Sequence, residues 1–153
     1  MKVRPAAIND IAAILALYRD LNREMAELQP FYIRPAEEDR EFLEAAVGSE
    51  TEDILIAEED GEVLGMAYIQ LEQTPVYKSI IPHRYTYLVD FIVRESSRGN
   101  GIGKKLLEGV ENWGKSRGSE YMELDVLSQN LNALRFYEKE NFEESVRVLR
   151  KRL

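Results

Sequence analysis

Apolar residues in the first third of the chain recur every three or four positions, the period of an amphipathic helix. Asn9 or Asp10 can cap the first such helix, and Pro30 ends it. A second helical pattern runs from Ala36 to Val47, and a short strand, Met1 to Pro5, precedes both. The residues expected to face inward are Ile11, Ile14, Leu15, Tyr18, Leu21, Met25 and Leu28 in the first helix, and Phe42, Leu43, Ala46 and Val47 in the second.

The apolar pattern then changes to that of β-strands. Two apolar runs, Ile54–Glu59 and Val63–Leu71, flank the dipeptide Asp60-Gly61. An Asp-Gly pair between such runs is the strongest local signal for an antiparallel hairpin. The proline-containing segment Gln73–Arg84 is expected to be a loop.

The second half of the chain alternates strands with helices. The pattern predicts strands at Tyr85–Val93, Tyr121–Val126 and Ser145–Arg150, separated by helices at Gly101–Arg117 and Asn130–Glu140. A strand, a helix and a strand in succession imply a parallel pair with a right-handed crossover. We therefore expect one α/β domain that spans the whole chain, with antiparallel strands first and a parallel pair later.

Composition limits the chemistry that the chain can perform. It has no cysteine and one histidine, which excludes thiol nucleophiles, disulfides, thiolate zinc sites and multi-histidine metal clusters. No run of about 18 apolar residues could span a membrane, and the first residues lack a secretory pattern, so we expect a soluble, cytoplasmic protein. A net charge of −8 argues against nucleic acid as a partner.

Acidic residues are concentrated in one stretch. From Glu37 to Glu62 there are twelve carboxylates and one basic residue, Arg40. A solvated helix face accounts for most of them. The functional alternative is a negative field that attracts a cationic substrate.

A glycine-rich segment, Arg98-Gly99-Asn100-Gly101-Ile102-Gly103-Lys104, joins a predicted strand to a predicted helix. Glycines let backbone N–H groups converge, and the helix N-terminus adds about half a positive charge, which indicates a pyrophosphate cradle. A Walker loop would need a longer spacing and a hydroxyl residue where Lys105 stands. The dinucleotide fingerprint lies near the first strand of its fold, so an NTPase or an NAD enzyme is disfavoured.

This segment resembles the acetyl-CoA-binding signature of the GNAT N-acetyltransferases, in which Arg or Gln, two residues, Gly, one residue and Gly or Ala follow the fourth strand. Arg98, Gly101 and Gly103 occupy the three signature positions. The resemblance implies the GNAT acyl-CoA N-acyltransferase fold, a mixed central sheet with helices on both faces, and acetyl-CoA as cosubstrate. The implied binding residues in the loop are Arg98, Gly99, Asn100, Gly101, Ile102, Gly103 and Lys104. The resemblance also implies Phe91, Ile92 and Val93 at the strand end, where backbone N–H groups stabilise an oxyanion in members of the family.

A second segment resembles the other GNAT motif, Asn-x-x-Ala-x-x-x-Tyr followed by Gly-Phe, with Asn141 in place of the glycine. Helical spacing puts Asn130, Ala133 and Tyr137 on one face. The resemblance implies that Asn130 and its neighbour Asn132 contact pantetheine and that the small side chain of Ala133 lets the ligand approach closely. It also implies that Tyr137 is the general acid. Because a tyrosine pKa of about 10 exceeds a thiol pKa of about 8.5, the phenol stays protonated and can donate to a leaving thiolate.

The acceptor side has fewer signals. Strict strand alternation would place Asp90 with Leu88 and Ile92 on one face of the sheet. Its carboxylate is either a structural acceptor for nearby backbone or a base and ammonium anchor, and the sequence favours neither. By family analogy Phe31, Tyr32 and Tyr87, together with Tyr77 and Tyr85, lie in or near the loops that shape the acceptor pocket. The lone His83 is expected to be incidental, and the alternative is a base placed before the fourth strand.

The leading hypothesis is an N-acetyltransferase that transfers acetyl from acetyl-CoA to a primary amine of a small molecule or peptide, by direct attack in a ternary complex. The alternatives are a GNAT-fold sensor that binds acyl-CoA without turnover, and a different nucleotide-binding enzyme. Tyr137 and Asp90 are the candidate catalytic residues, no metal is expected, the acceptor is expected to be cationic, and the family suggests a homodimer.

Overall fold

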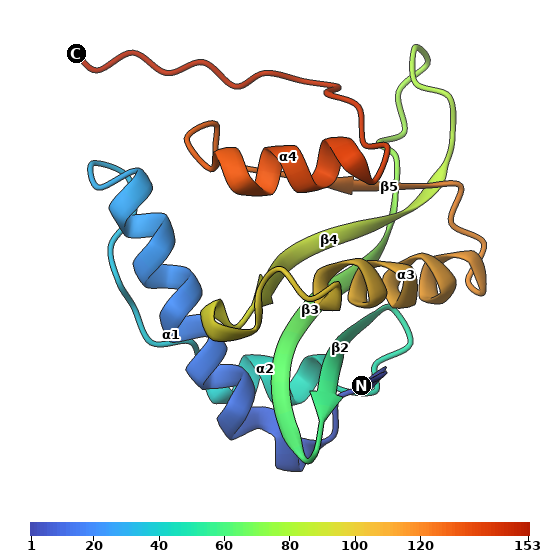
Figure 1. Ribbon diagram of the computed structural model, residues 1–153. Helices are drawn as coiled ribbons and strands as arrows, with labels where there is room; N and C mark the ends of the chain where they lie inside the picture. Colours follow the sequence, from blue (N-terminus) through green and yellow to red (C-terminus); the bar gives the residue numbers. More distant parts are fainter.

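The chain forms one five-stranded sheet with helices on both faces (Figure 1). The computed structural model describes residues 1–153. None of its helices combines the length and the apolar composition that a membrane crossing requires. The elements are β1 (Lys2–Pro5), α1 (Ile11–Leu28), α2 (Arg40–Ala46), β2 (Glu52–Glu59), β3 (Glu62–Gln73), β4 (Arg84–Val93), α3 (Ile102–Lys115), β5 (Tyr121–Leu124) and α4 (Leu131–Lys139), with short 3₁₀ turns at Ile8–Asp10 and Glu95–Ser97.

The strands lie across the sheet in chain order, β1-β2-β3-β4-β5. The first four pair antiparallel, whereas β4 and β5 are parallel and are joined through α3. The predicted hairpin forms between β2 and β3, where Asp60 and Gly61 have φ angles of 51° and 79°, the positive values that a type I′ turn requires. The mixed sheet expected from the sequence is therefore confirmed.

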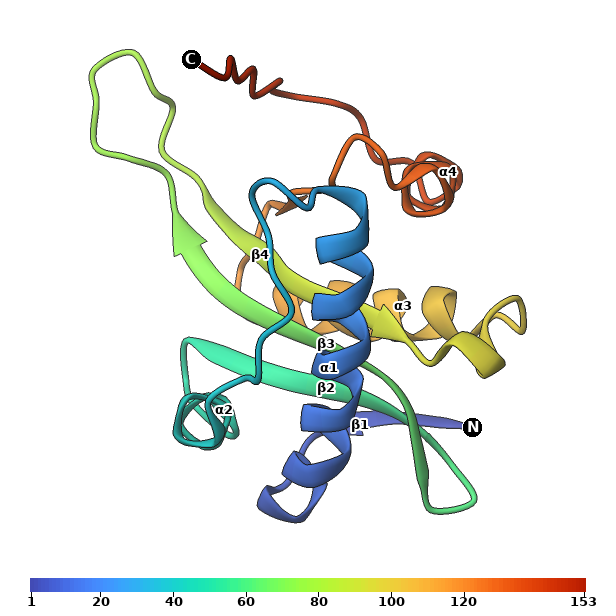
Figure 2. The same ribbon diagram turned by 90° about the vertical axis from the view of Figure 1, so that its left-hand side faces the viewer.

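Each face of the sheet has its own apolar core. In Figure 2, α1 crosses in front of the strands and α3 lies behind them. The α1 side includes the fully buried Ile11, Ile14, Leu43, Ile54, Ile56 and Met66, and the α3 side includes Leu106, Leu107, Val110, Ala67 and Ile69. Burial of each large aliphatic side chain contributes roughly 1.5–3 kcal/mol, so both helix faces are firmly attached to the strands between them.

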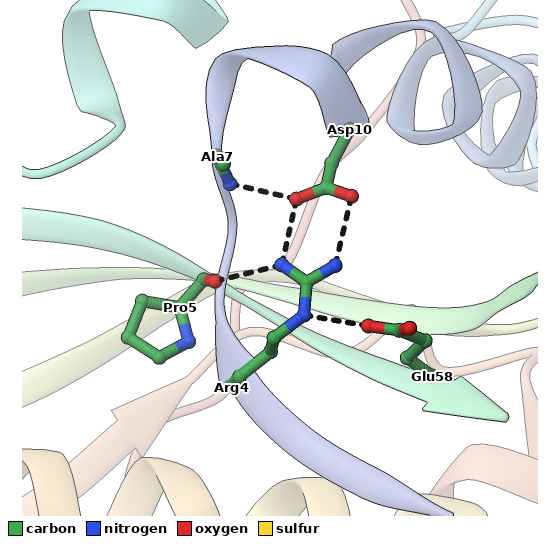
Figure 3. Close-up of polar contacts among 5 residues, drawn as sticks. All are labelled: Arg4, Pro5, Ala7, Asp10 and Glu58. Carbon is green, nitrogen blue, oxygen red and sulfur yellow. Dashed lines mark hydrogen bonds and ion pairs between the residues drawn. The ribbon is translucent and has the colours of Figure 1, made fainter. Parts of the chain in front are cut away.

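Arg4 of β1 ties the start of α1 to the sheet (Figure 3). Its Nε donates to Glu58 of β2 at 2.6 Å, and its two terminal nitrogens donate to the Asp10 carboxylate at 2.8 and 3.0 Å. Asp10 also accepts from the backbone N–H of Ala7 at 2.7 Å. These bonds lower the pKa of Asp10, with Arg4 as the main cause. The network helps to fix the path of α1, which brings Tyr18 to the site described below.

The second helix is shorter than predicted. We expected Ala36–Val47, but α2 spans only Arg40–Ala46. The side chain of Asp39 accepts a backbone N–H of the first turn, so the helix begins at this cap rather than at the first residue of the apolar pattern. Phe42, expected to face inward, is 44% exposed. The other predicted elements, except the last strand, agree within two residues at each end.

The strand predicted at Ser145–Arg150 does not form. Residues 143–153, here called the C-terminal arm, contain no helix or strand and are exposed along their whole length (Figure 1). No backbone group of the arm bonds to another backbone group. The alternating pattern was recognised correctly, but a strand exists only beside another strand, and the arm has none.

Candidate active site

The loop between β4 and α3 adopts backbone conformations that favour glycine. Gly99 and Gly101 have φ angles of 81° and 77°, and Gly101 is the N-cap residue of α3. None of the backbone N–H groups from Gly99 to Lys104 donates to a backbone carbonyl. The loop therefore presents six consecutive donors at the positive end of a helix, as an anion site requires.

The space in front of these donors is open. A Cβ added at Gly99 or Gly101 would meet no atom within 4 Å. At Gly103, by contrast, a Cβ would lie 3.4 Å from the ring of Phe136 and 3.8 Å from Phe91. The first two glycines thus shape the cradle, while the third lets α3 pack closely against α4 and β4. This arrangement fits a pyrophosphate bound through backbone N–H groups.

Arg98 connects the β4–α3 loop to neighbouring elements. Its Nε donates to the carbonyl of Val93 at 2.8 Å, and its Nη2 forms an ion pair with Glu24 of α1 at 2.7 Å. The guanidinium therefore links the end of β4 to α1. In this conformation its first role is to hold the loop in place.

The strand before the loop has one unpaired edge. β5 pairs only with Tyr85–Leu88 of β4. The rest of β4, Val89–Val93, has β3 on one side and no strand on the other. Backbone groups on this open edge can meet a ligand, because they have no ladder partner. The predicted oxyanion residues Phe91, Ile92 and Val93 all lie in this stretch.

The start of α4 differs slightly from the prediction. Asn130 is the N-cap rather than a helical residue, and its Oδ1 accepts from the N–H of Ala133 at 3.2 Å. One side of its amide is thereby used within the helix, and the Nδ2 side is left to contact a ligand. Asn132 is exposed and Ala133 is half-buried.

Tyr137 lies where α4 faces the end of β4. Its ring packs against those of Phe136, Phe142 and Phe91, with centroid distances of 5.3, 5.4 and 6.4 Å. Burial raises the pKa of Tyr137 to about 12, so the phenol is protonated at neutral pH. Asn141, the second residue after the helix, has φ of 66°, which confirms that it takes the left-handed conformation expected of the usual glycine.

Asp90 stands beside a β-bulge in β4. Two consecutive residues of β3 pair with Asp90 and Leu88, which leaves Val89 without a partner. Leu88 belongs to the core on the α3 side, whereas Val89 packs on the α1 side. The prediction that Asp90 shares a face with Leu88 is therefore wrong, because the extra residue shifts the alternation. The carboxylate and Ile92 both lie on the α1 side.

On that side the carboxylate meets α1 and the loop after it. Tyr18 of α1 donates its hydroxyl to Asp90 Oδ2 at 2.7 Å. Burial raises the pKa of Asp90, and the Tyr18 hydrogen bond opposes this rise. The pKa of Glu38 is also raised, by burial and then by the charge of Asp90. Neither carboxylate has a basic partner.

The other acidic residues of the Glu37–Glu62 stretch are mostly used elsewhere. Asp39 caps α2, and Glu52 accepts from the hydroxyl of Tyr68 at 2.7 Å. Ion pairs join Glu37 to Arg19, Glu44 to Arg40, Glu58 to Arg4, and Glu62 to Arg94. The stretch therefore serves structure in most positions, and Glu38 is the member whose pKa is raised by burial and by the charge of Asp90.

The predicted acceptor aromatics fall into two groups. Phe31 and Tyr32 are exposed in the loop after α1, with ring centroids 4.9 Å apart. A bond between Gln29 and Gln129 at 2.9 Å joins this loop to the one before α4. Tyr87 is half-buried in β4, and burial and Asp125 raise its pKa to about 12. The two groups belong to different elements, and no ring contact joins Tyr87 to Phe31 or Tyr32.

His83 lies outside this arrangement. Its Nδ1 is 2.9 Å from Glu120, at a surface pocket of about 310 Å³ formed mainly by the loop between β3 and β4. The pocket includes none of the residues assigned to acetyl-CoA. That His83 is incidental stays a prediction.

A family model described as "Acetyltransferase (GNAT) family" matches residues 14–142. The match includes both the β4–α3 loop and the Asn130–Tyr137 segment. The chain belongs to the GNAT family. It is an acetyltransferase with the α/β fold of that family, as predicted, and family members use acetyl-CoA.

Individual GNAT relatives agree with this assignment. The chain is 31% identical over 147 residues to YhfO of Bacillus subtilis (strain 168), described as an uncharacterized N-acetyltransferase. The alignment covers 94% of this chain and 91% of the relative. The solved structure of a tetramutant of the BH1408 protein from Bacillus halodurans has a TM-score of 0.93 at 25% identity and covers 100% of both chains. The aminoglycoside N-acetyltransferase AAC(6')-Iy in complex with CoA has the same fold, with a TM-score of 0.72, 21% identity, and coverage of 99% and 98%.

Two residues near Asp90 were not connected to it by the sequence interpretation. Tyr18 was assigned only to the inward face of its helix, and Glu38 only to the acidic stretch. Each approaches Asp90 through tertiary packing of α1 and its following loop. No local spacing in the sequence connects them, so only the fold could bring them to the site.

Proposed function

We propose that this chain transfers the acetyl group of acetyl-CoA to a primary amine of a small molecule or peptide, by direct attack in a ternary complex. The observation on which the proposal chiefly rests is the run of unengaged N–H groups from Gly99 to Lys104. The last glycine of this loop packs against Phe136 and Phe91, whose rings also pack against Tyr137. A binding loop close to a proton donor is what acyl transfer from a thioester needs.

On the cofactor side, the N–H groups of Gly99–Lys104 hold the pyrophosphate and the free Nδ2 of Asn130 contacts the pantetheine arm. The arm then runs along the open edge of β4. There, backbone N–H groups between Phe91 and Val93 stabilise the negative charge that develops on the carbonyl oxygen during attack. Donors that are fixed in advance cost no reorganisation at that moment, which is why a backbone site is effective.

Tyr137 donates the proton that the leaving thiolate requires. Its raised pKa of about 12 keeps the proton in place until the thiolate, a stronger base in this apolar surrounding than in water, accepts it. The aromatic rings around it exclude water and hold the phenol in one orientation. No covalent intermediate on the enzyme is needed in this sequence of steps.

Asp90 anchors the acceptor and takes its proton. An ammonium group that enters between Asp90 and Glu38 would supply the cation that both carboxylates lack. Tyr18 fixes one oxygen of Asp90 and leaves the other free. Because the pKa of Asp90 is raised, its carboxylate is a better base than an exposed aspartate, and it can release the amine in the neutral form that attacks. These features favour a cationic acceptor.

An amine panel tests the proposal. The purified protein is incubated with acetyl-CoA and single amines: a polyamine, an aminoglycoside, free amino acids, and peptides with a free N-terminus or a lysine. We expect CoA thiol release that depends on one class of cationic amine and gives a stoichiometric N-acetyl product by mass spectrometry. Calorimetric binding of acetyl-CoA without thiol release for any amine would instead support an acyl-CoA sensor.

A further inference from the structure

Two arginines of the C-terminal arm stack on the exposed aromatic pair in the loop after α1. The arm turns back over α4 and ends above this loop (Figure 1). The guanidinium of Arg150 lies 4.4 Å from the ring centroid of Tyr32, and that of Arg152 lies 3.7 Å from the ring centroid of Phe31. Arg150 also donates to the side chain of Gln29 at 3.4 Å. Stacking uses the face of a guanidinium, so N–H donors at its edge stay free for a ligand.

Neither of these arginines has an anionic partner. Other exposed arginines, such as Arg40 and Arg147, pair with a carboxylate of their own segment. No carboxylate forms an ion pair with Arg150 or Arg152, although the chain carries a net charge of −8. Two guanidiniums that are held by rings and lack a carboxylate are a prepared site for one, because the planar fork of arginine matches a carboxylate in two hydrogen bonds. They are called the basic end below.

The same loop carries Glu38, which with Asp90 forms an acidic end that lacks a basic partner. Asn22 of α1 donates to the carbonyl of Ala36 at 2.9 Å, so the returning part of the loop runs back beside the helix (Figure 2). Burial raises the pKa of Tyr18, and the charges of Asp90 and Glu38 raise it further. Both carboxylates therefore lie near Tyr18, at the middle of α1.

The basic end is displaced from the acidic end along the axis of α1. Phe31 and Tyr32 follow the last residue of this helix, Leu28. From Tyr18 to Leu28 the helix advances by ten residues at about 1.5 Å each, so the two ends lie roughly 15 Å apart. An extended peptide covers at most about 3.3–3.6 Å per residue, and about four or five residues span this distance.

We propose, on the basis of the function proposed above, that the acceptor is an acidic peptide. Its free N-terminal amine is held between Asp90 and Glu38, and carboxylates about four or five residues later bind Arg150 and Arg152. A polyamine or an aminoglycoside offers only cations, which the basic end repels, and a free amino acid is too short to reach both ends. In the transfer the C–N bond forms and the C–S bond breaks, which gives the N-acetyl peptide, CoA thiol and one proton.

Matched peptides with a free N-terminus and an amidated C-terminus test the acceptor class. The first is Ser-Gly-Ser-Gly-Glu-Glu, and the second has glutamine in place of both glutamates. The third, Ser-Glu-Glu-Gly-Ser-Gly, keeps the composition and the charge but places the carboxylates next to the amine. We expect the first peptide to have a KM roughly 10-fold lower than either of the others. Equal KM values for the first and second peptides would overturn the acidic acceptor, and equal values for the first and third would overturn the spacing.

Substitutions in the arm test whether the two arginines bind these carboxylates. In Arg150→Gln/Arg152→Gln the KM of the first peptide should rise roughly 10-fold, to that of the glutamine peptide. The KM of the glutamine peptide and the calorimetric Kd for acetyl-CoA should stay unchanged. The control, Arg147→Gln/Lys151→Gln, removes two charges from the same arm but leaves both stacked guanidiniums, so it should keep the preference. An equal loss in both variants contradicts a site at Arg150 and Arg152.

The amine panel separates a failure of this acceptor from a failure of the enzyme activity. Absence of N-acetyl product with every amine and every peptide ends both proposals. Acetylation of a polyamine or an aminoglycoside, but of none of the three peptides, leaves the N-acetyltransferase function standing and overturns the acidic peptide as acceptor. Acetylation of the first peptide at its N-terminal amine, located by mass spectrometry, with the lowest KM of the panel is the result that we expect.

Discussion

The proposed cofactor side and the proposed acceptor side of the site use different parts of the polypeptide. Backbone N–H groups of Gly99–Lys104 and the open edge of β4 form the first, whereas side chains of Tyr18, Glu38 and Asp90 form the second. A backbone site depends on conformation and tolerates changes of side chain. A side-chain site changes with each substitution, so we expect substrate specificity to reside on the acceptor side.

The largest expected effect comes from breaking the backbone site. Gly101→Val puts a β-branched residue at φ of 77°, where such residues are strongly disfavoured, and displaces the donors. At a ligand concentration of 100 times Kd, acetyl-CoA should raise the Tm of the wild type by roughly 5–10 °C, and this increase should disappear in the variant.

A matched control separates strain from binding. Gly118 follows the other end of α3 and has φ of 80°. Strain at the positive φ should lower the Tm of the free protein in Gly118→Val about as much as in Gly101→Val. Only Gly118→Val should keep the increase in Tm that acetyl-CoA causes. An intact increase in Gly101→Val would place the pyrophosphate elsewhere.

The second effect distinguishes catalysis from binding on the cofactor side. Tyr137→Phe keeps the ring among its aromatic neighbours and removes the proton donor. We expect kcat to fall about 100-fold to 10,000-fold, while the calorimetric Kd for acetyl-CoA changes little, because the lost interaction belongs to the transition state. Tyr121→Phe, on exposed β5, is the control. Unchanged turnover in Tyr137→Phe, measured where chemistry limits the rate, would assign the proton to water.

The third effect belongs to the acceptor side alone. Asp90→Asn keeps the size and the bond from Tyr18 but removes the charge. Loss of a charged hydrogen bond of about 1.5–3 kcal/mol should raise the KM of a cationic amine roughly 10-fold to 100-fold and leave acetyl-CoA affinity unchanged. Asp20→Asn, a surface change on α1, should have no such effect. Equal KM values in wild type and Asp90→Asn would remove the carboxylate from acceptor binding.

The smallest expected effect is that of Asp90→Asn on stability. This substitution should weaken acceptor binding but stabilise the fold at neutral pH. Burial raises the folded-state pKa of Asp90, so its neutral form stabilises the fold at low pH and this contribution is lost as pH rises through that pKa. At pH 7 the variant Asp90→Asn should therefore have a higher Tm than the wild type, and the difference should shrink on acidification. Calorimetric scans across pH 4–7 measure it, and a lower Tm at pH 7 would mean that the charge is compensated in the fold.

The same contrast explains what could be predicted from sequence. Gly99, Gly101 and Gly103 act through local conformation next to a strand and a helix, and local patterns are readable from one sequence. Asp90 was recognised as a candidate and correctly grouped with Ile92, but its grouping with Leu88 was wrong, because a bulge in β4 depends on pairing with β3. Tyr18 was not connected to the site at all, since 72 positions separate it from Asp90 and only packing joins them.

The two incorrect elements have similar causes. The shortened α2 begins at the cap Asp39, where a side-chain bond to the backbone overrides the apolar period. The missing strand at 145–150 has the right alternation, but its backbone bonds to no other strand of the chain. Alternation therefore predicts the capacity for a strand, whereas its formation depends on what lies beside it.

The most direct test of the backbone site is the amide NMR spectrum of the isotopically labelled protein during titration with CoA. Hydrogen bonds to phosphate move the proton resonances of the donating amides. We expect the largest shifts on Gly99 to Lys104, with smaller ones along Phe91–Val93 and at the start of α4. Largest shifts in the loop from Gln73 to Arg84, with the glycine amides unmoved, would contradict it.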